Sequence, residues 1–169
     1  MAPSVSTRPK VAFVYTLWFT WIDPVLSLIG AYGGFFVPNL LLASYIPDTV
    51  ASPAAPKELS PNPNAMANPA HALIFNQLGG FFLLTFTLST FLLRYTPDFT
   101  IWSLYEGAIL IVDVIILVAT ALAYANQGRL SPFTWRPEDW FSVLVTGLCA
   151  VLRAGFVLRI GVGEKEKRN

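Results

Sequence analysis

Four charged residues stand inside long apolar stretches of this chain. They are Asp23 in "WIDP", Glu106 and Asp113 in "YEGAILIVD", and Arg153 in "VLRAGF". Burying a charge away from water is costly unless it is paired, so residues placed this way are expected to face one another. Two carboxyl groups in one apolar pocket can differ in protonation, and such a pair provides a base and an acid for proton-transfer chemistry.

The elements that must position these residues are four apolar stretches, at residues 11–37, 72–93, 101–125 and 140–162. Each is long enough to cross a bilayer as a helix, which takes about 20 residues. The chain of 169 residues is 54% hydrophobic and 12% charged, whereas soluble domains carry about 25% charged residues. Lipid cannot satisfy backbone groups, so spanning segments are helical. We therefore predict an all-α fold, a polytopic membrane four-helix bundle forming one domain over residues 1–169.

The connections between these helices differ in length. Residues 47–71 are rich in Pro, Ala and Asn and predict a long irregular loop. "RYTPDF" at residues 94–99 is so short that the second and third helices must form an antiparallel hairpin. The third connection ends in Pro-Glu-Asp before Trp140, which is typical of a helix start because acids favour the positive end of the helix dipole.

Basic residues predict the orientation, since they concentrate on the cytosolic side. Seven would lie on the side of the two termini and three on the other, so we expect cytosolic termini and a luminal loop at 47–71. The seven are Arg8, Lys10, Arg94, Arg159, Lys165, Lys167 and Arg168, and the three are Lys57, Arg129 and Arg136. The terminal "KEKRN" resembles the dilysine retrieval signal of endoplasmic reticulum membrane proteins. The alternative is a simple basic flank after the last helix.

The predicted topology brings the charges to similar depth. At a rise of about 1.5 Å per residue, Asp23 and Asp113 lie roughly 18 Å from the cytosolic side and Arg153 roughly 14 Å. Glu106 would lie nearer the edge, at roughly 8 Å, on the same face as Asp113. A charge at mid-membrane costs at least about 2.5–3.5 kcal/mol on insertion scales, which favours mutual pairing.

The charge balance separates two interpretations. Arg153 neutralises only one carboxylate, so an excess acid in this setting is expected to keep its proton. One ionised and one protonated carboxyl would form a catalytic or ligand site made of Asp23, Asp113, Arg153 and Glu106, with Glu106 only tuning the field. The alternative is a structural clasp, an ion-paired group that fixes helix packing.

Other residues are candidates for supporting roles. Asn76 and Gln77 enter from the luminal side, and the aromatic residues Trp21 and Tyr105 could line an apolar substrate pocket. Pro24 is expected to loosen the first helix and to free backbone carbonyls near Asp23. The glycines of "GAYGG" and "QLGG" are expected to allow close helix contact.

Several function classes have no support in the sequence. Cys149 and His71 are each the only residue of their type, so we expect no metal site. There is no Walker loop, GxSxG, HExxH or dinucleotide fingerprint, and no cofactor is expected. The net charge of +1 gives no reason to expect a nucleic-acid partner.

A resemblance to a fungal family of small four-span membrane proteins covers nearly the whole chain. It rests on "LWFTWIDPVLSLIGAY", "NQLGGFFLL", "LLRYTPDFTIW", Asp113, "WRPEDW" and "RAGFVLRIGVG", in that order. Members of that family occur beside polyketide genes, and some are similar to the membrane epoxide hydrolases of aurovertin, citreoviridin and asteltoxin biosynthesis. Those enzymes act on polyene polyketides after a flavin monooxygenase has installed the epoxides.

The resemblance implies an epoxide hydrolase or cyclase of secondary metabolism. An Asp–Arg–Asp group opens epoxides in soluble limonene-type hydrolases, and Asp23, Arg153 and Asp113 would be its membrane counterpart, with Asn76 or Tyr105 orienting water. The expected partners are a lipophilic substrate, membrane lipid and other biosynthetic enzymes. Two alternatives remain: an isomerase or terpenoid cyclase that uses the same acids, and a scaffold without catalytic activity.

Overall fold

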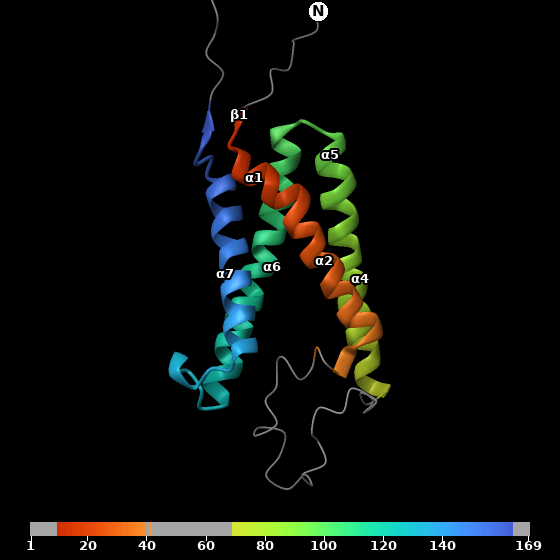
Figure 1. Ribbon diagram of the computed structural model, residues 1–169, viewed down its shortest axis with the longest axis vertical. Helices are drawn as coiled ribbons and strands as arrows, with labels where there is room; N and C mark the ends of the chain where they lie inside the picture. Colours follow the sequence, from red (N-terminus) through yellow and green to blue (C-terminus); the bar gives the residue numbers. More distant parts are fainter. Residues whose placement is uncertain (1–9, 40, 42–68, 164–169) are drawn as a thin grey trace, which may run out of the picture.

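The computed structural model describes residues 10–39, 41 and 69–163. Four of its helices are long and apolar enough to cross a membrane: Phe13–Phe36, Ala72–Tyr95, Phe99–Asn126 and Pro137–Val157. The predicted all-α membrane bundle of four helices is confirmed (Figure 1). Most of the predicted loop at 47–71, together with Lys165 and Lys167, lies outside the described residues.

The first span is interrupted by a π-helical turn directly before Asp23. The strand β1 (Lys10–Val11) precedes this span, which consists of α1 (Phe13–Leu17), the π-helix η1 (Trp18–Ile22) and α2 (Asp23–Phe36). Pro24 has no N–H, so the carbonyl of Thr20 lacks its usual donor four residues later. The Nη2 of Arg94 donates to that carbonyl instead, at 2.6 Å. The expectation that Pro24 frees a carbonyl near Asp23 is therefore confirmed.

The second and third spans form the predicted hairpin. The second is α4 (Pro69–Thr87), the π-helix η2 (Leu88–Leu92) and α5 (Leu93–Tyr95), and the third is α6 (Phe99–Asn126). The Asp98 carboxylate accepts a hydrogen bond of 2.8 Å from the Thr100 backbone N–H and so caps α6. The π-helices η1 and η2 contact each other, and such segments often mark functional sites.

The fourth span ends earlier than the sequence predicts. A short 3₁₀ helix η3 (Pro132–Thr134) precedes α7, which covers Pro137–Val157 rather than residues 140–162. The chain then turns through Arg159 and Gly161, which have positive φ angles of 61° and 75°. This turn lets β2 (Val162–Gly163) pair antiparallel with β1. The apolar character of residues 158–162 therefore reflects closure against the start of the chain rather than one more helical turn.

Close contact between α2 and α4 depends on glycine, as the sequence predicts. A Cβ added to Gly34 would lie 2.7 Å from both Gly79 Cα and the Phe75 carbonyl oxygen. Helices α6 and α7 also pack along each other. At the end of the bundle where α1, α5 and the end of α7 meet (Figure 1), all four spans share a core of Tyr15, Phe19, Leu93, Tyr105 and Phe156.

Candidate functional site

The four charged residues singled out by the sequence meet at one buried guanidinium group. Arg153 on α7 donates from Nη2 to Asp23 Oδ1 at 2.6 Å and from Nε to Glu106 Oε2 at 3.1 Å. Its Nη1 donates to Asp113 Oδ2. The exposed fractions of the four residues are 2% for Arg153, 4% for Asp23, 0% for Glu106 and 7% for Asp113. We refer to these residues as the Arg153 cluster.

Glu106 is a full member of this cluster, although helical rise places it nearer the membrane edge than Asp113. Glu106 and Asp113 share a face of α6, and side chains on a helix lean toward its N-terminus. Asp113 therefore leans toward Glu106. The long Arg153 side chain reaches both, with Nη1 on Asp113 and Nε on Glu106. Helical rise gives the depth of each residue's backbone and does not include the length of the Arg153 side chain.

The cluster holds more negative than positive charge. Three carboxyl groups face one guanidinium, so full ionisation would leave an excess of two negative charges. Among the described residues, Asp23 Oδ2 and Glu106 Oε1 are buried without a hydrogen-bond partner. A buried unpaired carboxylate is costly, so the excess must be neutralised by protons or by a donor on a ligand. The arrangement can therefore hold and exchange protons.

A polar wall from α4 and η2 lies beside the charges. The Tyr105 hydroxyl donates to the Thr85 carbonyl at 3.0 Å, and the fully buried Ser89 hydroxyl donates to the same carbonyl at 2.8 Å. Tyr105 is close enough to Glu106 and Asp23 to interact with them electrostatically. The structure thus brings Tyr105, a predicted substrate-binding residue, to the cluster.

Three other predicted substrate-binding residues lie elsewhere. Asn76 and Gln77 are exposed on α4, whose buried side in this region carries Phe75 and Gly79. They precede Ser89 by 13 and 12 residues, which is roughly 20 Å along a helix. Trp21 is 60% exposed, and its ring lies under the guanidinium of Arg94, 4.3 Å from ring centroid to Cζ. The structure does not bring these three residues into contact with the charges.

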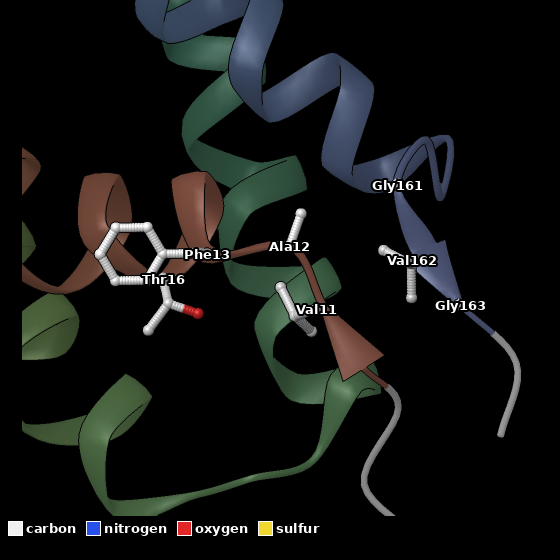
Figure 2. A pocket seen from close by; sticks show the side chains of 7 residues that line it. All are labelled: Val11, Ala12, Phe13, Thr16, Gly161, Val162 and Gly163. Atoms are coloured by element: carbon white, nitrogen blue, oxygen red, sulfur yellow. The ribbon is translucent and has the colours of Figure 1, made fainter.

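Two open grooves lie at the end of the bundle that contains β1 and the α5–α6 turn. The first has a volume of about 700 Å³, and Figure 2 shows its lining residues, which come from the start of the first span and from residues 161–163. The second has a volume of about 470 Å³, and its lining includes Thr16, Thr20, Trp21, Arg94, Thr96 and Trp102. The charged residues of the Arg153 cluster line neither groove. Thr20, however, stands three residues before Asp23, so the second groove approaches the cluster.

A second ion cluster, which the sequence reading did not identify, lies at the start of α7. The fully buried Asp139 accepts hydrogen bonds from the Arg136 backbone N–H at 2.9 Å, from the Tyr124 hydroxyl at 3.1 Å and from the guanidinium of Arg129. Its hydrogen bond with the Arg136 side chain raises the pKa of that arginine above its usual value. We call this group the Asp139 cluster. The spacing in "WRPED", an acid three residues after an arginine at a helix start, is the signal that could have indicated it.

The fold and the Arg153 cluster define a four-helix integral membrane protein with a buried, acid-rich ion-pair site. The chain belongs to a family described as a domain of unknown function (DUF7704), which it matches over residues 9–163. The match includes all four spans and every residue of both ion clusters. Comparison with curated proteins and with solved structures gives no match.

Proposed function

We propose that this protein is a membrane-embedded epoxide hydrolase or cyclase that opens epoxides of a lipophilic polyene polyketide by acid–base catalysis. The observation that carries the proposal is the geometry at Arg153, whose two terminal nitrogens hold Asp23 and Asp113 side by side. Epoxide opening needs a base that activates a nucleophile and an acid that protonates the ring oxygen. Two carboxyl groups fixed by one guanidinium meet both needs if one is ionised and the other holds a proton.

The proposed reaction requires no cofactor. The ionised aspartate takes a proton from water while the water oxygen forms a bond to one epoxide carbon. The bond between that same carbon and the ring oxygen breaks, and the ring oxygen, which stays on the neighbouring carbon, takes the proton of the second aspartate. The product is a vicinal diol, and proton transfer between the two carboxyl groups restores the starting state. A hydroxyl group of the substrate in place of water would give a cyclic ether.

Each acid has a distinct place in this scheme. Asp113 has the most accessible side chain of the three, at 10%, so a substrate meets it first. Asp23 has an oxygen without a partner that is free to exchange a proton. Glu106 binds Nε of Arg153 and adds a third carboxyl group to the site. The wide apolar surface of α6, which includes Ile111, Ile115 and Leu122, suits a substrate that arrives from the bilayer.

Isotope labelling tests the reaction type. We expect microsomes containing the protein to convert a polyene epoxide in H₂¹⁸O into a diol with one ¹⁸O atom, or into an unlabelled cyclic ether. Microsomes carrying an Asp23→Asn, Asp113→Asn double variant are the matched control and should form neither product. An unlabelled rearranged isomer formed without addition of any oxygen nucleophile would overturn the proposal and favour an isomerase or terpenoid cyclase.

We further propose residence in the endoplasmic reticulum with both termini in the cytosol, in contact with other biosynthetic enzymes. The excess of basic residues at that end supports this orientation. The pairing of β1 with β2 supports an even number of membrane crossings, since it places both ends of the described chain together. Protease treatment of intact microsomes should remove a C-terminal tag. A protected tag would contradict the orientation and the retrieval role of Lys165 and Lys167.

A further inference from the structure

The second groove is lined by Arg94, a positively charged residue that is not part of the Arg153 cluster. Arg94 follows the π-helix η2 and lies between the Thr20 carbonyl, 2.6 Å from its Nη2, and the ring of Trp21. Within the part of the chain that the structure describes, no carboxylate pairs with Arg94. A guanidinium has five N–H donors. Arg94 therefore retains donors that a ligand can use.

The walls of this groove suit an amphiphile. Thr16, Thr20 and Thr96 contribute hydroxyl groups, whereas Trp102 and Phe99 contribute flat aromatic surface. An arginine fork matches the geometry of a carboxylate, and a flat conjugated chain packs well on aromatic rings. The groove shares Val11 and Thr16 with the groove of Figure 2, so the two grooves are neighbours at this end of the bundle.

The groove lies about one helical turn from the catalytic carboxylates. Thr20 lines the groove and precedes Asp23 by three residues, which is about 5 Å along the helix axis. A long molecule whose oxygenated end binds at Arg94 would therefore extend past Thr20 toward the Arg153 cluster. The distance between that end and the epoxide would determine which epoxide of a polyene reaches the carboxylates.

We propose that this groove binds the acidic, oxygen-bearing end of the polyene substrate, with Arg94 as the residue that binds it. The inference rests on the proposed function and adds a specificity site to it. Arg94 selects substrates by their charged end and sets the position of the epoxide relative to Asp23 and Asp113.

Binding of a non-reactive probe tests the groove separately from catalysis. The full chain in phosphatidylcholine nanodiscs is titrated with the conjugated tetraene cis-parinaric acid and with its methyl ester, and energy transfer from tryptophan is followed. A lost hydrogen bond to a charged group weakens binding by about tenfold or more, so Arg94→Gln should reduce affinity for the acid by that amount. Affinity for the ester should change little. Arg94→Lys keeps the charge and should retain part of the affinity.

Arg159→Gln is the matched control, because Arg159 lies at the same end of the bundle, stacks over Phe99 at 5.2 Å and does not line the groove. It should bind the acid as the wild type does. Equal affinity of Arg94→Gln and wild type, or an equal loss in Arg159→Gln, would overturn the inference. Thermal unfolding in the same nanodiscs verifies that each variant is folded.

Two further outcomes separate this inference from the proposed function and from lipid binding. Asp23→Asn should keep wild-type affinity for the probe while losing turnover. Arg94-dependent binding in a protein that opens no epoxide would overturn the proposed function and leave the groove as a carboxylate site. If phosphatidic acid displaces the probe through Arg94 and Arg94→Gln leaves KM for the epoxide unchanged, the groove binds membrane lipid and its assignment to the substrate is wrong.

Discussion

Two buried ion clusters lie along α7, and they use the same residue types in opposite proportions. The Asp139 cluster surrounds one acid with two arginines and a tyrosine, and both carboxylate oxygens accept hydrogen bonds. The Arg153 cluster surrounds one arginine with three acids and leaves two carboxylate oxygens without partners. The two key residues are 14 positions apart, or roughly 21 Å along the helix.

From this difference we infer that the Asp139 cluster is a structural clasp and that the Arg153 cluster is the site of the proposed chemistry. In the Asp139 cluster, the acid also accepts from the Arg136 backbone N–H as part of a capping box, so its bonds fix the start of α7. Every charge there has a partner, and both oxygens of the buried carboxylate accept hydrogen bonds. The Arg153 cluster joins α2, α6 and α7 but keeps unsatisfied acceptors in a buried place. Unsatisfied buried polar atoms are rare in native proteins, and a proton or ligand donor at these two oxygens would satisfy them.

The largest effect on stability is expected from removal of the central arginine. Arg153→Ala would leave three buried acids without their partner, and breaking a buried pair costs about 3–5 kcal/mol. The Asp113→Asn, Arg153→Gln double variant removes one of the unpaired charges and should be less destabilised than Arg153→Ala. Reversible unfolding in mixed micelles measures these free energies. Strictly additive losses for Asp113 and Arg153 in a double-mutant cycle would show that the two residues do not interact.

A smaller loss is expected at the Asp139 cluster. Asp139→Asn removes the charge that Arg129 and Arg136 share, and hydrogen bonds to charged groups contribute about 1.5–3 kcal/mol. Both arginines are partly exposed, so water can replace some of the lost interaction. The same unfolding assay should show a loss within or below that range, and turnover per folded molecule should stay at the wild-type level. A large fall in turnover in Asp139→Asn would show that the Asp139 cluster takes part in the reaction and would contradict its structural role.

A contact without charges gives a reference for the stability losses expected at the two ion clusters. Gly34→Ala would place a methyl group 2.7 Å from Gly79 Cα, and overpacking of this kind costs about 1–3 kcal/mol. Gly80→Ala is the matched control, since nothing lies within 4 Å of an added Cβ there. It should leave the free energy of unfolding unchanged or slightly higher. Equal effects of the two substitutions would mean that α2 and α4 do not pack through Gly34.

The sequence predicted the parts of this structure that depend on hydrophobic length and on the cost of buried charge. Four apolar runs required four helices, and the mid-membrane position of Asp23, Asp113 and Arg153 required a common site. The end of α7 could not be predicted in the same way. Residues 158–162 are apolar enough to continue a helix, but the chain turns at Arg159 and Gly161, and Val162 then pairs with Val11 of β1.

The contacts made by side chains were the other part of the structure that the sequence did not predict. Helical rise gives Glu106 a different depth from Asp113, and the length of the Arg153 side chain lets one guanidinium bind both. The predicted topology places Asn76 and Gln77 on the luminal side of the charges, yet both are exposed and the buried face of α4 carries Phe75 and Gly79 instead. The partners of Asp139 are residue 124 on α6 and residues 129 and 136 on the connection to α7, and their convergence depends on how that connection turns.

The central claim is that the carboxyl groups of the Arg153 cluster transfer protons, and turnover in aspartate variants tests it most directly. Asp23→Asn and Asp113→Asn keep side-chain size and remove the carboxylate, and general acid–base catalysis contributes about 10²–10⁴-fold. Consumption of a polyene epoxide in microsomes, normalised to protein level, should fall by that factor in each variant. Asp139→Asn serves as the control. Wild-type turnover in both aspartate variants would contradict the account and make the Arg153 cluster a second structural clasp.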